Sequence, residues 1–426
     1  MVVGPFCLGV LLNYSVKDLK LASQGKAQIE WAETQMGALL EVQKRFAKEK
    51  PLKGEKVGMA LHVTKETAVL VKTLIAGGAK VAITGCNPLS TQDDVAAALA
   101  EEGVHVYAKK GETKEEYYEY LNKVLDFSPT ATIDDGLDLV TEIHTKRTNL
   151  LSQIKIGTEE TTTGVIRLRA MQKDKALKYP VIAVNDNKTK HLFDNYYGTG
   201  QSTIDGILRA TNILFAGKVV VVVGYGDCGK GVADKASGFG SNIIVVEVDP
   251  IRALQAKMDG YSLMTLERAL PLGDVFITVT GNKHVIPKAA FRKMKDGAIL
   301  ANSGHFDVEI DVKGLEEISS KKRRIRWQLD EYTLKSGKKI YLCAEGRLVN
   351  LGAAEGHPST VMSLSFCGQA LALEYGLKHN LSAGLHVLPD SVDQHIARLQ
   401  LKAMGVHIQS LTREQEKYLN SWKEGT

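Results

Sequence analysis

Residues 219–250, VVVVVGYGDCGKGVADKASGFGSNIIVVEVDP, decide the fold of the second half of the chain. The five consecutive valines predict a buried strand, and Gly224, Gly226 and Gly229 follow it in the spacing G-x-G-x-x-G. A helix and a second strand, which ends at Glu247, are expected next. A strand, glycine turn, helix and strand in this order indicate the first unit of a dinucleotide-binding α/β domain.

The glycine turn is suited to a pyrophosphate. The first glycine permits the tight turn, the second lets the backbone approach the phosphates, and the third lets the helix pack on the strand. The carboxylate of Glu247 would bind ribose hydroxyls and repel a 2'-phosphate, which favours NAD over NADP, although Arg252 lies nearby. Asp249, which precedes Pro250, is expected to shape the turn rather than bind cofactor. A glycine turn that binds nothing is the alternative.

Short apolar runs alternate with helical patterns along most of the chain, which is typical of right-handed crossovers and parallel sheets. We predict two doubly wound parallel-sheet α/β domains with a small C-terminal helical tail. The expected boundaries are 14–198 for the first part of a substrate-binding domain, 199–356 for an NAD-binding Rossmann domain, 357–389 for the return to the substrate-binding domain, and 390–426 for the tail.

Composition excludes several classes of protein. A chain of 426 residues with 44% hydrophobic and 24% charged residues is neither fibrous nor disordered. The one dense basic run, Lys321 to Arg326, is short enough to be a solvated face or turn, so no nucleic-acid partner is expected. Five dispersed cysteines without a C-x-x-C pair indicate free thiols and a cytoplasmic location. Residues 1–13 are apolar but lack a basic signal-peptide region, and are expected to form a loosely packed leader.

Polar side chains that a Rossmann domain does not need follow several of the predicted strands. For each group alone, a helix cap, a turn or a surface ion pair is the alternative. Their positions at strand ends nevertheless favour a common site. The groups are His62, Thr64 and Glu66; Asp134, Asp135 and Asp138; Glu159 to Thr163; Lys190, Asp194 and Asn195; and His305, Asn350 and His357.

Six blocks of sequence resemble those of the S-adenosyl-L-homocysteine hydrolase (adenosylhomocysteinase) family. They are STQDDVAAAL, EETTTGV, FDNYYGTGQS, GYGDCGKG, GHFDVEID and AEGRLVNLGAAEGHP. The resemblance extends in family order from about Asp18 to Trp422.

The resemblance implies reversible hydrolysis of S-adenosyl-L-homocysteine to adenosine and L-homocysteine, a reaction of the methyl cycle in one-carbon metabolism. In this family NAD oxidises the ribose 3'-hydroxyl, which makes the C4' proton acidic. Homocysteine then leaves C5' by β-elimination, water adds, and the ketone is reduced again. The resemblance also implies a homotetramer that binds small molecules, with no membrane partner.

Five catalytic residues are implied by the resemblance. Lys190 would be the base for the 3'-hydroxyl, oriented by Asp194, with a pKa lowered by desolvation or a second cation. Asp135 would remove the C4' proton, and His62 would handle the proton of the leaving thiol with it. His305 would approach the ribose from the cofactor side.

The binding residues follow from the same resemblance. Glu66 would accept a hydrogen bond from the amino group of adenine, which predicts an adenosyl rather than an inosyl substrate. No metal-ligand spacing stands out. The implied substrate-binding residues are Thr64, Glu66, Glu160, Thr161, Asn195 and His357. The implied cofactor-binding residues are Thr161, Thr162, Thr163, Gly224, Gly226, Asp227, Gly229, Glu247, Asn282, Ser303 and Asn350.

Three features depart from the family pattern. Thr199 stands where the family commonly has a cysteine that could tune the cofactor. Leu137 stands where a second glycine is usual, in the loop that carries Asp135. The sequence stops at LNSWKEGT, without the lysine and tyrosine tail of many members, so we expect weaker retention of NAD.

Two other functions stay open on sequence alone. An NAD-dependent 2-hydroxyacid dehydrogenase shares the two-domain arrangement, but it would need an arginine clamp for a carboxylate. A catalytically silent NAD-binding regulatory homologue would be expected to have lost catalytic side chains, all of which are present here.

Overall fold

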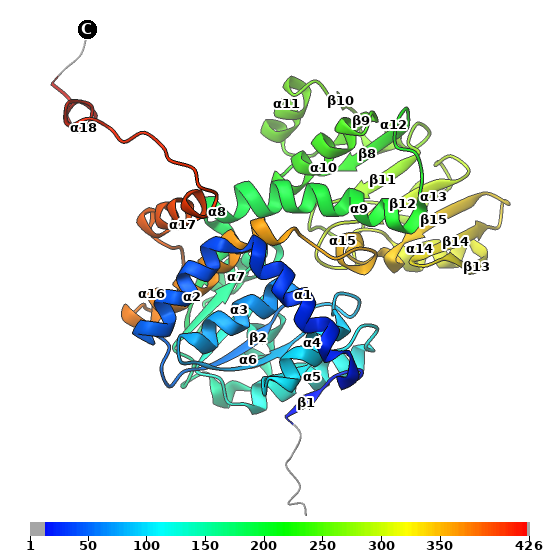
Figure 1. The fold of residues 1–426 in the computed structure, drawn as a ribbon. Coiled ribbons are helices and arrows are strands. Elements are labelled where there is room, and N and C mark those ends of the chain that lie inside the picture. The colour runs from blue at the N-terminus through cyan, green and yellow to red at the C-terminus, as the bar shows by residue number, and fades with distance from the viewer. Residues whose placement is uncertain (1–12, 424–426) are drawn as a thin grey trace, which may run out of the picture.

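The computed structural model describes residues 13–423, and it consists of two β-sheets with their covering helices. The N-terminal leader lies outside the described residues. In Figure 1 the lobe around the first sheet is mostly blue to cyan, and the lobe around the second is green to yellow. The division into two α/β units agrees with the predicted fold class.

The first sheet has eight strands, and all of its strand pairs are parallel. Its last strand comes from the C-terminal part of the chain. In spatial order the strands are β1 (Tyr14–Ser15), β4 (His105–Tyr107), β3 (Lys80–Thr84), β2 (Lys56–Ala60), β5 (Ala131–Asp134), β6 (Ile156–Glu159), β7 (Pro180–Ala183) and β16 (Gly384–His386).

Helices on both faces bury this sheet, as its almost continuously apolar strands require. They are η1 (Leu19–Leu21), α1 (Ala22–Gln35), α2 (Gly37–Glu49), α3 (Lys65–Ala76), α4 (Asp93–Glu101), α5 (Lys114–Asp126), α6 (Asp138–Thr145), η2 (Thr148–Leu150), α7 (Thr162–Lys173), η3 (Val184–Asp186) and α16 (Ser359–Lys378).

The second sheet also has eight strands, and the five valines of the opening motif form its central strand β8. Its helices are α10 (Asp227–Gly238), α11 (Pro250–Met258), α12 (Leu266–Ala269), α13 (Lys288–Phe291) and α14 (Val312–Ile318). The spatial order of the strands is β10 (Ser262–Leu263), β9 (Asn242–Val246), β8 (Val219–Val223), β11 (Val275–Thr278), β12 (Ala298–Asn302), β15 (Lys339–Cys343), β14 (Leu329–Leu334) and β13 (Ser319–Arg326).

The second sheet is parallel except at one edge. Strands β13, β14 and β15 pair in antiparallel fashion, because the short turns between them cannot make a parallel crossover. The basic run Lys321 to Arg326 lies in the exposed edge strand β13, where Arg323 pairs with Glu331 of β14 at 2.8 Å. The run is therefore a solvated face, and Arg323 and Arg324 of it are paired with carboxylates within the hairpin.

Two connections join the sheets. On the way out the chain passes through α8 (Lys188–Lys190), the π-helix η4 (His191–Gly198) and α9 (Thr199–Thr211). It returns through η5 (Ala344–Gly346), α15 (Val349–Gly352) and α16.

The C-terminal part leaves the body of the molecule. Helix α17 (Asp390–Ala403) packs against α2, and α18 (Arg413–Leu419) lies at the end of an arm that extends away from both lobes (Figure 1). None of the described helices combines the length and apolar character that crossing a membrane requires. The cytoplasmic location remains a prediction.

Candidate active site

A cavity of about 970 Å³ lies where the carboxyl ends of the two sheets face each other. Residues that follow β2, β5 and β6 form one side of it, the first wall. Residues that follow β8, β9, β11 and β12 form the other side, the second wall. Every residue of the implied catalytic, substrate-binding and cofactor-binding sets except Gly229 lines this cavity, whereas Asp134, Asp138 and Glu159 of the polar groups do not. The structure thus brings together side chains that are up to 295 positions apart, from His62 to His357.

The glycine turn has the backbone geometry that the motif predicts. Gly224 has φ +103°, a conformation that favours glycine, and α10 begins directly after Gly226. Gly229 does not line the cavity, because it lies in the first turn of α10 against the strand end: a Cβ there would be 2.1 Å from the carbonyl oxygen of Gly224. Its hydrogen side chain allows the close packing of helix on strand.

Glu247 lies beside this turn. Its Oε2 accepts a hydrogen bond from the backbone N–H of Tyr225 at 2.6 Å, and Oε1 accepts one from Asp249 at 2.9 Å. The side chain of Asp249 in turn caps α11, which agrees with its predicted role in shaping the turn. Asp227, at the start of α10, contacts Nδ1 of His191 at 3.0 Å.

Lys190 lies at the centre of a buried polar cluster on the first wall. Its Nζ is 2.7 Å from Oδ2 of Asp194 and donates to Oδ1 of Asn195 at 2.7 Å. Oε1 of Glu160 is 3.7 Å from the same Nζ, and Oδ1 of Asn185 is at 3.5 Å. The predicted neighbours of Lys190 therefore surround it, and Asn185 is a further partner that sequence reasoning missed.

The expected lowering of the Lys190 pKa was wrong for this structure. Burial does lower the pKa, but the charges of Asp194 and Glu160 outweigh it and raise the pKa above its usual value. Lys190 is consequently held as an ammonium by its two carboxylate neighbours.

His357 extends this cluster. Its Nδ1 contacts Oδ1 of Asp194 by a short hydrogen bond, and its Nε2 accepts from the amide of Asn350 at 3.1 Å. Because Nε2 accepts, Nδ1 carries the proton that is donated to Asp194. His357 and Lys190 together hold the pKa of Asp194 well below its usual range, although burial alone would raise it.

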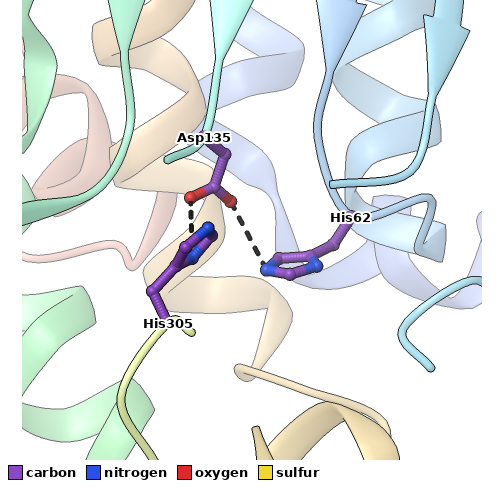
Figure 2. A group of neighbouring side chains, drawn as sticks. All are labelled: His62, Asp135 and His305. Atoms are coloured by element: carbon purple, nitrogen blue, oxygen red, sulfur yellow. Dashed lines mark ion pairs between the residues drawn. The ribbon is translucent and has the colours of Figure 1, made fainter. Parts of the chain in front are cut away.

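A second cluster consists of His62, Asp135 and His305, and Figure 2 shows the two imidazoles converging on the carboxylate. Nε2 of His62 is 3.4 Å from one oxygen of Asp135, and Nδ1 of His305 is 3.5 Å from the other. Burial lowers the pKa of His62 to about 4, although the charge of Asp135 opposes this. His62 is therefore neutral at physiological pH and can accept a proton.

Cys86 belongs to the same cluster and was missed by sequence reasoning. Its thiol lies 3.2 Å from Nδ1 of His62 and donates to Asp135 at 3.6 Å. Burial raises its pKa well above the usual value, as do the charges of Asp135 and Asp134, so it is a thiol rather than a thiolate. Its position after strand β3, at the same sheet edge as His62, is the signal that could have identified it.

Two glutamates complete the first wall. Burial raises the pKa of Glu160 to about 7, and its carboxylate accepts hydrogen bonds from Ser365 and Gln369 of α16. Glu66 is 2% exposed, and its Oε1 accepts from the hydroxyl of Ser359 at 2.6 Å. Both carboxylates thus face the cavity with one long helix behind them.

The two internal departures from the family pattern have local explanations. Thr199 contacts Sγ of Cys228 at 3.5 Å, so a thiol from α10 lies next to the position where a cysteine was expected. Leu137 adopts φ +73° and is fully buried, so the loop after Asp135 keeps a left-handed residue although it lacks the second glycine. Such a conformation costs about 1–2 kcal/mol for a residue with a side chain.

Family models match both halves of the chain. The model described as S-adenosyl-L-homocysteine hydrolase matches residues 13–155, and the model described as S-adenosyl-L-homocysteine hydrolase, NAD binding domain, matches residues 195–356. The second match identifies NAD as the cofactor of the domain that carries the glycine turn.

Curated relatives are similar over nearly the whole chain. An adenosylhomocysteinase of Sulfolobus acidocaldarius is 59% identical, over 97% of this chain and all of the relative. An S-inosyl-L-homocysteine hydrolase of Methanocaldococcus jannaschii is 58% identical over the same shares. An adenosylhomocysteinase of Aquifex aeolicus is 57% identical, again over 97% and 100%. Overall identity therefore does not separate an adenine from a hypoxanthine substrate.

Proposed function

Because the chain belongs to the S-adenosyl-L-homocysteine hydrolase family, we propose that it hydrolyses S-adenosyl-L-homocysteine reversibly to adenosine and L-homocysteine. One observation carries this proposal: the buried acid–base cluster around Lys190 and the dinucleotide turn at Gly224 open onto one cavity. A 2-hydroxyacid dehydrogenase or a silent regulatory homologue is not favoured, because the relatives at 57–59% identity carry hydrolase names.

The residues of the second wall fit NAD. A Cβ added at Gly226 would have no atom closer than 3.5 Å, so the cavity side of the turn is open to phosphates. The side-chain oxygen of Asn350 is buried and lacks a hydrogen-bond partner, as an acceptor for a bound amide would. When bound, NAD would accept a hydride from the ribose and return it at the end of the cycle. Glu247, Asn282, Ser303 and Asn350 would hold it.

Lys190 would take the proton of the 3'-hydroxyl. To accept it, Nζ must first lose its own proton, and the carboxylate of Glu160, whose Oε1 lies 3.7 Å from Nζ, is the neighbour that can take it. Asn195 and Asn185 would keep Nζ in place during this transfer. Glu160 would bind ribose hydroxyls, and with a pKa of about 7 it could gain or lose a proton near neutral pH.

Asp135 would remove the C4' proton and His62 would protonate the leaving sulfur. The backbone at Asp135 is fixed, because its N–H donates to Oδ1 of Asp134 at 3.0 Å. The side chain of His62 is held by Ser90, whose hydroxyl contacts Nδ1 at 2.8 Å. The buried thiol of Cys86 would relay a proton between them, since it contacts both. His305 would exclude water from the opposite side.

The first test is thiol release from S-adenosyl-L-homocysteine by the purified protein with NAD. We expect release that requires NAD, with no net accumulation of NADH. Steady NADH production would indicate a dehydrogenase, and NAD binding without thiol release would indicate the regulatory homologue. The same assay with S-inosyl-L-homocysteine determines the preferred base; we expect the adenosyl substrate to be turned over more efficiently.

We also propose that the protein is a homo-oligomer, with the tetramer of its family as the expected state. The C-terminal arm supports this, because Ile408, Leu411, Leu419 and Trp422 are all more than half exposed. Apolar side chains on an extended arm are typical of contacts between subunits. Light scattering after size-exclusion chromatography would give the assembly state.

A further inference from the structure

Lys65 is a buried cation that the proposed mechanism does not use. It is the first residue of α3, its side chain is 8% exposed, and its Nζ lies 3.4 Å from Oε1 of Glu66. Glu66 lines the cavity, whereas Lys65 lies behind it. The ammonium therefore acts on the cavity through the carboxylate of Glu66.

A second carboxylate fixes this ammonium in place. Oε2 of Glu355, in the segment between α15 and α16, accepts a hydrogen bond from Lys65 at 3.0 Å. Oε1 of Glu355 pairs with Arg209 of α9 at 3.2 Å, and Arg209 pairs with Asp205 at 3.0 Å. Lys65 is thus held by an ion network built from three segments, so its position beside Glu66 is well defined.

The ammonium of Lys65 lies 3.4 Å from Oε1 of Glu66, close enough to act on it by its charge. A buried carboxyl without a cation favours its protonated form, which both donates and accepts hydrogen bonds. Burial lowers the pKa of Lys65, but Glu66 and Glu355 outweigh burial and raise it, so Lys65 remains an ammonium. Ser359 and Lys65 occupy Oε1, and no hydrogen bond among residues 13–423 reaches Oε2. Oε2 therefore faces a ligand as an acceptor.

We propose that Lys65 is a specificity-determining residue, which keeps Glu66 an acceptor and so selects the 6-amino group of adenine over the 6-keto oxygen of hypoxanthine. The inference rests on the proposed function. An amino group donates to an ionised carboxylate, whereas a keto oxygen would place two acceptors against each other in a buried site. Lys65 acts through Glu66, and it is therefore a positioning residue rather than a catalytic one.

The test compares adenosyl and inosyl substrates in the holoenzyme. For Lys65→Gln we expect the ratio of kcat/KM for S-adenosyl-L-homocysteine to that for S-inosyl-L-homocysteine to fall at least about tenfold. Lys65→Arg should restore the ratio, because it returns a cation beside Glu66. Lys72→Gln is the matched control, since Lys72 lies on the same helix and pairs with Glu33, away from the cavity.

Dissociation constants of adenosine and inosine provide a readout without turnover. In Lys65→Gln the preference for adenosine over inosine in binding should fall as well. Lys65→Met is the second variant if Lys65→Gln does not fold. An unchanged ratio in a folded variant that hydrolyses S-adenosyl-L-homocysteine would overturn the inference and leave the proposed function intact. A wild-type protein that hydrolyses neither substrate would instead overturn the proposed function. The dissociation constants of adenosine and inosine for wild type and Lys65→Gln would then decide the role of Lys65.

Discussion

The carboxyl ends of the two sheets offer different groups to the same cavity. The second sheet offers mainly backbone: a glycine turn, the start of a helix, and Glu247 bonded to main-chain N–H groups. The first sheet offers buried, titratable side chains that contact one another in pairs, such as Lys190 with Asp194 and His62 with Asp135. The difference agrees with the proposal that the second sheet holds the cofactor and the first performs the acid–base chemistry.

Removal of Lys190 should have the largest effect. Lys190→Ala deletes the group that we propose takes the 3'-hydroxyl proton. We expect thiol release to fall about 10³–10⁴-fold, since general acid–base catalysis usually contributes about 10²–10⁴-fold. NAD binding should be retained, because Lys190 belongs to the first wall. Lys188→Ala is the control, since Lys188 is exposed and pairs with Asp390 at 3.2 Å. Equal turnover by both variants would contradict the assignment.

Gly229→Ala should damage the second wall instead. The new Cβ would lie 2.1 Å from the carbonyl oxygen of Gly224 and would force the turn apart. We expect the dissociation constant of NAD, measured by calorimetry, to rise at least about 100-fold. Gly238→Ala, in the same helix, adds a Cβ with no atom within 4 Å and should leave NAD affinity unchanged. Tight NAD binding by Gly229→Ala would show that the turn does not hold the cofactor.

Gly136→Ala separates chemistry from cofactor binding. Its Cβ would lie 2.2 Å from Nε2 of His305, so the imidazole would be displaced from Asp135. We expect kcat to fall roughly tenfold to 100-fold with little change in NAD affinity. Gly111→Ala is a matched control for backbone strain, because Gly111 also has a positive φ, +84°, but open space around it. A similar loss in both variants would mean that strain, and not the displacement of His305, is responsible.

The smallest effect is expected at Glu112, a buried carboxyl group of the first domain that lies outside the cavity. It tests whether such a group lowers the stability of the folded chain. Burial raises its pKa from 4.5 to about 8, and neither carboxylate oxygen has a hydrogen-bond partner. Between these two pKa values the folded chain keeps a proton that the unfolded chain has lost. The free energy of unfolding therefore falls as pH rises through this window.

Glu112→Gln should remove this fall. We expect the variant to be more stable than the wild type above about pH 8 by on the order of 2 kcal/mol, and to match it near pH 4.5. Denaturant unfolding at both pH values measures the difference. Activity should not change, because Glu112 does not line the cavity. A constant difference at all pH values would assign the effect to packing.

The sequence alone determined the cofactor wall, since its signal is local. A strand, a G-x-G-x-x-G turn and a helix lie within 20 consecutive residues, and their backbone geometry depends little on distant parts of the chain. The alternation of apolar runs and helices likewise predicted two α/β units. It could not predict the antiparallel edge of the second sheet, because the apolar pattern of a strand does not state the direction of its neighbour.

Only the tertiary structure decided the chemistry of the first wall. The family resemblance named Lys190, Asp194 and His62, but the pKa of each depends on burial and on charges from distant segments. The raised pKa of Lys190 and the place of Cys86 beside His62 therefore could not be obtained from spacing. The ion pair of Lys65 with Glu355 joins residues 290 positions apart, and only the fold brings them together.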